Sequence, residues 1–106
     1  MNEQSDTETL SGYVVDLACL RKYPQEERLE RARAHTRDCA LMGHCVESGY
    51  GLVGDDGRLA LLDARATPLV VDVLQQSDRE QGIRLQVSRR KGDHGMKTVQ
   101  VHELNP

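Results

Sequence analysis

Hydrophobic and polar residues alternate along the last quarter of the chain with a period of two. Ile83, Leu85 and Val87 alternate with polar neighbours, and Val99 and Val101 repeat the pattern nearer the C-terminus. A period of two places successive side chains on opposite faces of a sheet. The pattern therefore predicts two strands at the end of the chain.

Three further strands are predicted before these two. Residues 11–19 (SGYVVDLAC) contain a β-branched run, and residues 50–54 and 58–63 flank an Asp-Asp-Gly turn. Gly57 supplies the positive φ angle that a tight hairpin requires. Residues 1–10 are polar and predict a flexible tail.

Two helices are predicted where apolar residues recur at a spacing of three and four. The first extends from Pro24 to about Met42, with glutamates in its first turn and arginines nearer its end, as the helix dipole favours. The second extends from about Pro68 to Gln76, with Thr67 as its N-cap.

The order of these elements predicts the fold. Without the first helix, the chain has three strands, a helix and two strands, which is the connectivity of the OB fold. We therefore expect a single, mainly β domain with two helices over residues 11–104. It would form a five-stranded OB-like barrel, and the first helix would carry a Cys/His insertion between strands one and two. An open five-stranded α+β sheet fits the same order.

Composition and charge exclude several partner classes. The net charge is −3, and the chain has no Phe, no Trp and only 3 Tyr, so it lacks the basic face and stacking platforms of nucleic-acid binders. No apolar run approaches the roughly 20 residues of a membrane span. Residues 1–10 lack the apolar segment of a signal peptide. We expect a cytoplasmic protein, or a periplasmic or exported one if a leader was removed.

The candidate chemistry lies in a short region that contains all 3 cysteines and two of the 4 histidines. His35 and Cys39 are four residues apart on the predicted helix, so they would project from adjacent turns. Thiolates and imidazole are the ligands of tetrahedral zinc sites, and the same soft donors suit Cu(I). The predicted ligands are Cys19, His35, Cys39 and Cys45, and Asp16 either orients them or replaces one.

Other uses of the cysteines stay open. A disulfide can join any two of them in an oxidising compartment, and because their number is odd at least one thiol has no internal partner. Buried cysteines can also serve as small apolar residues of the core. No Cys-x-x-Cys motif is present, and no catalytic residue is assigned.

Three segments around the cysteines resemble a known family. They are residues 12–19 (GYVVDLAC), His35 with the Cys-Ala-Leu-Met of residues 39–42, and residues 45–51 (CVESGYG). The family consists of small, uncharacterised, mostly exported bacterial proteins. The resemblance covers about residues 11–104 and implies an OB-type barrel, but it brings no activity. It implies one motif that contains Asp16, Cys19, His35, Cys39 and Cys45.

The sequence thus favours a non-enzymatic domain that binds zinc or copper through its Cys/His cluster, with no prediction of a protein partner. Two alternatives belong to other classes. One is a disulfide-stapled OB-type module with a ligand-binding or structural role. The other is a thiol redox or sensor protein, which requires at least one cysteine of lowered pKa.

Overall fold

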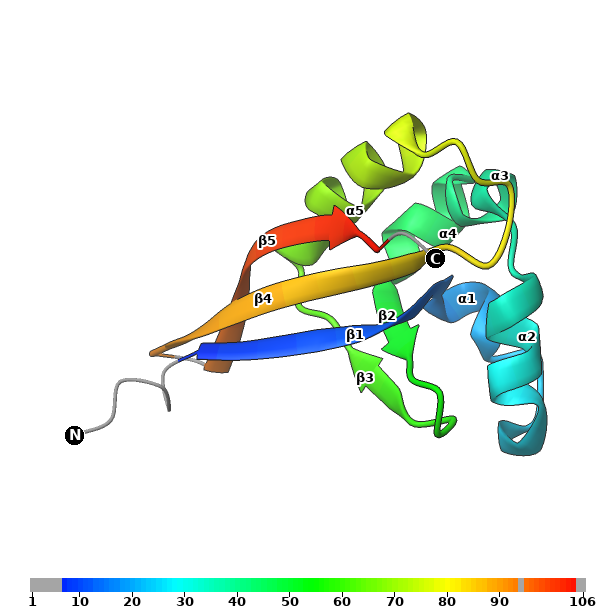
Figure 1. Cartoon of the computed structure of the whole chain (residues 1–106), viewed down its shortest axis with the longest axis horizontal. Coiled ribbons are helices and arrows are strands. Elements are labelled where there is room, and N and C mark those ends of the chain that lie inside the picture. Colours follow the sequence, from blue (N-terminus) through cyan, green and yellow to red (C-terminus); the bar gives the residue numbers. More distant parts are fainter. Residues whose placement is uncertain (1–6, 94, 105–106) are drawn as a thin grey trace.

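The computed structural model describes residues 7–93 and 95–104. Its centre is a five-stranded antiparallel sheet with the strand order β3-β2-β1-β4-β5 (Figure 1). The structure therefore confirms the predicted mainly β domain and shows that its five strands form one sheet. The strands are β1 (Thr7–Asp16), β2 (Tyr50–Val53), β3 (Leu59–Leu61), β4 (Arg84–Gly92) and β5 (Gly95–Glu103).

The sheet is open, so the structure matches the open-sheet alternative and does not show a barrel. Strands β3 and β5 form its two edges, and over the described ranges each pairs with one neighbour only. Because β3 has three residues, little strand is available at that edge to close the sheet. Residues 7–10, which were predicted as part of a flexible tail, belong to β1, and residues 1–6 lie outside the described part.

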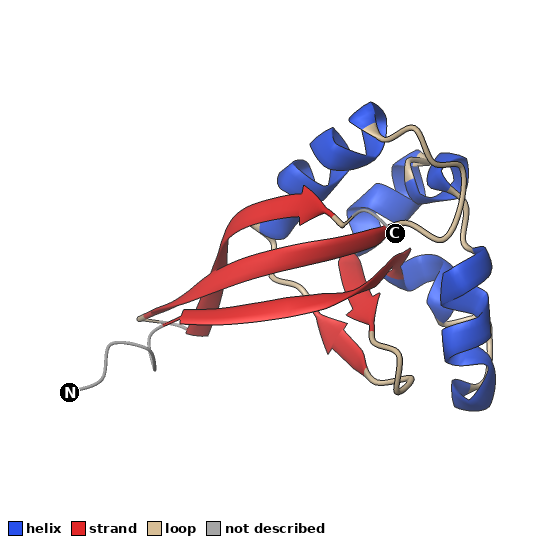
Figure 2. Cartoon of the chain, in the orientation of Figure 1, coloured by secondary structure: helices blue, strands red, loops and turns tan. Residues whose placement is uncertain are grey.

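Helices surround one end and one side of the sheet (Figure 2). In Figure 1 the short helices gather where β1 ends, and α5 lies beside β5. None of the helices in the described ranges is long and apolar enough to span a membrane. The helices are α1 (Leu17–Leu20), η2 (Gln25–Glu27), α2 (Arg28–Ala34), α3 (Arg37–Ala40), α4 (Gly43–Ser48) and α5 (Ala66–Gln76).

Two apolar clusters hold these layers together, one on each face of the sheet. Val14 of β1 belongs to the larger cluster with Val70 and Leu74 of α5, and its neighbour Val15 packs with Ala32 of α2. Successive strand residues point to opposite faces, so both faces of β1 are covered near its end. The residue that follows, Asp16, is consequently enclosed, with no exposed surface.

The single helix predicted from Pro24 to Met42 is wrong, because the chain leaves helical geometry at His35. The backbone there pairs with a distant segment: the carbonyl of His35 accepts from Gly82 N at 3.1 Å, and Arg37 N donates to Glu80 O at 2.8 Å. Gly82 has a φ of 62°, and a Cβ on it would lie 2.8 Å from the carbonyl oxygen of Arg33. Only glycine therefore permits this approach.

Candidate metal centre

Asp16 lies at the junction between β1 and α1 and is completely buried. It is the N-cap of α1, where its Oδ2 accepts a hydrogen bond from Cys19 N at 2.8 Å. Burial alone would raise the pKa of Asp16, but the neighbouring imidazole of His35, the N–H of Cys19 and the Cys45 thiol hold it below its ordinary value. A negative charge is thus stabilised at the centre of the domain.

His35 meets this carboxylate from the end of α2. Its extended backbone (φ −66°, ψ 133°) turns the ring inward, and its side chain is only 8 % exposed. The Nε2 atom lies 2.7 Å from Oδ1 of Asp16, yet neither atom has a hydrogen-bond partner of acceptable geometry among the described residues. The two buried atoms are thus at ion-pair distance but are not aligned for a regular hydrogen bond, so the pairing satisfies each of them only in part.

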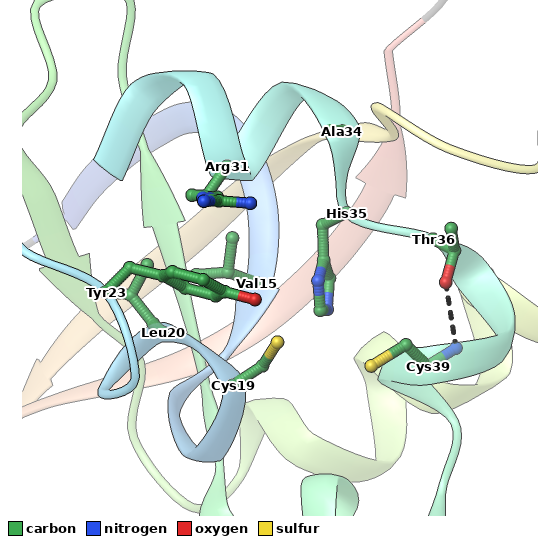
Figure 3. A pocket seen from close by; sticks show the side chains of 9 residues that line it. All are labelled: Val15, Cys19, Leu20, Tyr23, Arg31, Ala34, His35, Thr36 and Cys39. Atoms are coloured by element: carbon green, nitrogen blue, oxygen red, sulfur yellow. Dashed lines mark hydrogen bonds between the residues drawn. The ribbon is translucent and has the colours of Figure 1, made fainter. Parts of the chain in front are cut away.

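Cys19 and Cys39 bring two thiols to the same point from different helices. Cys39 is placed by α3, whose N-cap Thr36 accepts a hydrogen bond from Cys39 N through its Oγ1 at 3.2 Å. Figure 3 shows both sulfur atoms beside the His35 ring. One ligand atom from each of Asp16, Cys19, His35 and Cys39 lies within 4.8 Å of every other in this group.

Cys45, the fifth predicted residue, is on α4 and is not a member of the four-atom group. Its residue is 2 % exposed. Burial first, then the adjacent Asp16 carboxylate and Cys39 thiol, raise the pKa of Cys45 to about 12. The structure therefore places Cys45 beside the group as a protonated thiol that faces Asp16.

All three cysteines are free thiols. Burial, followed by the proximity of the Cys39 thiol and the Asp16 carboxylate, raises the pKa of Cys19 as well. The protons of Cys19 and Cys45 are thus held more firmly than those of an ordinary thiol. Low thiol pKa values are the signature of reactive cysteines, and these two residues have the opposite shift.

Two residues that the sequence analysis did not select help to position the group. Tyr50 pairs with Asp16 across β1 and β2, is buried, and donates its hydroxyl hydrogen bond to the carbonyl of Ala40, next to Cys39. Ser48 Oγ accepts from Ala18 N at 3.0 Å and donates to Cys45 O at 2.7 Å, which ties α1 to α4. The sequence signal for both is that they lie in residues 45–51, one of the segments that carry the family resemblance.

A cavity of about 190 Å³ opens on one side of the group. Three of the four grouped residues line it, whereas Asp16 lies behind them and does not. The remaining wall is formed by Val15, Leu20, Tyr23, Arg31, Ala34 and Thr36 (Figure 3).

Comparison with protein-family models, with curated proteins and with solved structures gives no significant match for this chain. Its function is therefore inferred from the chemistry and geometry of its own residues. The four residues Asp16, Cys19, His35 and Cys39 are of the types that could hold a metal ion.

Proposed function

We propose that this domain binds a thiophilic metal ion through Asp16, Cys19, His35 and Cys39. The observation that carries the proposal is the convergence of these four ligand atoms within 4.8 Å from two segments of the chain, residues 16–19 and 35–39. The poorly aligned pair formed by Oδ1 of Asp16 and Nε2 of His35 supports it, because one cation can bind both atoms once their separation widens from 2.7 Å to about 3.4 Å.

Zinc is the ion that this donor set favours most. Two thiolates, an imidazole and a carboxylate are all ordinary zinc ligands, and four of them complete a tetrahedral site. Cu(I) is the second candidate, since it prefers the soft sulfur donors and makes little use of a carboxylate. In both cases Cys45 orients Asp16 from behind, as its burial and its contact with that carboxylate suggest.

Binding requires only a small rearrangement of the group, in which the wider separations shorten and the 2.7 Å separation of Asp16 Oδ1 and His35 Nε2 lengthens. Zinc–sulfur bonds of about 2.3 Å in a tetrahedron place two sulfurs about 3.8 Å apart. The widest separation in the group is at most 4.8 Å. A side-chain movement of about 1 Å therefore suffices, which rotamer adjustment at Cys19 and Cys39 can supply because both line an open cavity.

The redox or sensor alternative is less well supported. It requires a thiol of lowered pKa, but the pKa values of Cys19 and Cys45 are both raised. The disulfide alternative keeps one supporting observation, because the sulfurs of Cys19 and Cys39 are within 4.8 Å of each other. In an oxidising compartment these two thiols would be the first to join.

Two broader expectations belong to the same proposal. We propose that the chain is a relative of the small bacterial proteins that its Cys/His segments resemble. We also propose that the strand order derives from an OB-like arrangement with an inserted metal-binding region between β1 and β2. Both would be tested by the structure and metal content of another protein that carries the same Asp/Cys/His segments.

The deciding experiment measures metal content and free thiols in protein purified without chelator. We expect about one equivalent of zinc and loss of that zinc in the variants Cys39→Ser and His35→Ala. The matched control is His44→Ala, since His44 lies outside the four-atom group. A full equivalent of metal in folded Cys39→Ser, or no metal uptake by the reduced wild-type protein, would overturn the proposal.

A further inference from the structure

The metal site is asymmetric, and its open side has a chemistry of its own. Asp16 is fully buried behind the group, whereas Cys19, His35 and Cys39 all face the cavity of about 190 Å³. An ion held by these residues is therefore reachable from one direction only. Structural zinc sites have four protein ligands and catalytic sites three, so a further ligand at this four-residue group has to enter from the cavity side and either add to the protein ligands or displace one of them.

We propose that this cavity admits a small anion, such as a short-chain carboxylate, which becomes an exchangeable ligand of the bound metal and is held by Arg31 and Tyr23. The inference rests on the proposed metal binding. It adds that the bound ion, together with the cavity wall, recognises a second ligand. Zinc accepts such a ligand by expansion to five-coordination or by displacement of one weak protein ligand.

The charge of the cavity wall favours an anion. Arg31 is the only Lys or Arg that lines the cavity in the described chain, and no Asp or Glu lines it; its positive charge offsets the negative charge that Cys19 and Cys39 carry as thiolate ligands. Its guanidinium carbon lies 4.0 Å from the centre of the Tyr23 ring, which fixes its orientation. Figure 3 shows the Arg31 guanidinium and the Tyr23 hydroxyl directed toward the space beside His35 and Cys19.

Both groups have hydrogen-bonding capacity to spare. Glu27 Oε1 accepts from Nε and Nη2 of Arg31 at 3.1 and 3.0 Å. Among the hydrogen bonds of the described residues, none involves Nη1 of Arg31 or the hydroxyl of Tyr23. These two groups can therefore donate hydrogen bonds to an anion without breaking an existing bond. Glu27 competes with the anion because it already forms an ion pair with Arg31.

The size of the cavity limits the ligand to a few non-hydrogen atoms. Pockets for drug-sized molecules occupy about 300–1,000 Å³. A cavity of about 190 Å³ is too small for a nucleotide but accommodates acetate or azide. The apolar part of the wall, formed by Val15, Leu20 and Ala34, suits a short hydrocarbon chain beside the charged end.

The test uses the Co(II)-loaded full chain, because the visible absorption of Co(II) changes when a ligand joins its coordination shell. Acetate and azide are titrated separately at constant ionic strength. We expect a saturable spectral change with each anion. Arg31→Gln should weaken the apparent affinity about tenfold, the size of a lost charged hydrogen bond. Glu27→Gln should strengthen it, because Arg31 then loses its competitor.

A control variant and two contrary outcomes distinguish a failure of the anion proposal from a failure of the proposed metal binding. Arg33→Gln removes the same charge from α2, but Arg33 does not line the cavity, so it should leave anion affinity unchanged. Co(II) binding without any response to anions would mean a closed site and would overturn the inference alone. Equal effects of Arg31→Gln and Arg33→Gln would also overturn it. Failure to bind Co(II) would overturn the proposed function as well.

Discussion

Two aspartates in this domain show how similar groups serve different ends. Asp63 follows β3, and its two oxygens accept hydrogen bonds from Thr98 N (3.1 Å), Thr98 Oγ1 (2.6 Å) and Arg65 N (3.3 Å). Asp16 is more deeply buried, yet within the described structure its well-aligned hydrogen bond comes from Cys19 N alone, and its Oδ1 has no aligned partner.

The difference identifies which carboxylate belongs to a site. A buried charge that serves stability alone is expected to have its lone pairs satisfied, as those of Asp63 are. Asp16 is the more deeply buried of the two and has fewer well-aligned hydrogen bonds, which is the reverse of that expectation. The missing partner of Asp16 is therefore best supplied by a ligand, and the two aspartates should respond in opposite ways to substitution.

Addition of zinc gives the largest expected effect. At a free zinc concentration about 1,000 times the dissociation constant, a single site raises the free energy of unfolding by about 4 kcal/mol. Asp16→Asn should remove most of this gain, since it replaces a charged ligand, while Asp63→Asn should retain it. Thermal unfolding with and without zinc measures both. Equal zinc stabilisation in the two variants would exclude Asp16 from the site.

Replacement of Asp63 itself should lower stability in the metal-free protein. Burial would raise the pKa of Asp63, but the hydrogen bonds from Thr98 and Arg65 hold it below its ordinary value. A group whose pKa is lowered on folding contributes stability above its unfolded pKa, and this stability is lost as the pH falls through the folded pKa. The loss is therefore expected below about pH 4.

Asp63→Asn tests this assignment. It should cost about 2 kcal/mol at pH 7, because it weakens charged hydrogen bonds that join the segment after β3 to β5. It should also flatten the pH dependence of stability below about pH 4. Urea unfolding at pH 7 and pH 3 provides both numbers. A variant as stable as the wild type at pH 7 would show that Asp63 contributes little to the fold.

The sequence predicted the members of the four-residue group better than the way they are assembled. The five predicted residues lie between positions 16 and 45 and are visible as a cluster in the sequence, and four of them come together. Their placement on one continuous helix was wrong, because the backbone of His35 pairs with Gly82, 47 residues away. Periodicity reports local structure and carries no signal for such a distant pairing.

The start of α5 was mispredicted for a similar reason. Thr67 satisfies the usual preference for a hydroxyl residue before the first helical proline. The helix begins two residues earlier, at Ala66, after a cap at Arg65 without a side-chain bond. The preceding turn is fixed by Asp63, whose carboxylate is bound to Thr98 on β5. A long-range contact therefore sets a boundary that local capping rules place elsewhere.

The smallest predicted effect is the difference between two threonines, Thr36, which caps a helix, and Thr67, which was predicted to cap one and does not. Thr36→Ala removes the side-chain cap of α3 and should cost about 1 kcal/mol, because the N–H of Cys39 loses its acceptor. Thr67→Ala should change stability by less than about 0.5 kcal/mol, since Thr67 lies inside α5 and caps nothing. Urea unfolding of the metal-free variants measures the difference.

Zinc affinity extends this comparison to the site. Thr36→Ala should weaken zinc binding as well, because the cap holds the backbone of a ligand, and Thr67→Ala should not. A stability loss in Thr36→Ala with unchanged zinc affinity would mean that Cys39 is positioned by other contacts. The hydrogen bond from Tyr50 to the carbonyl of Ala40 is then the remaining local restraint, and it would make β2, rather than the cap, the element that places Cys39.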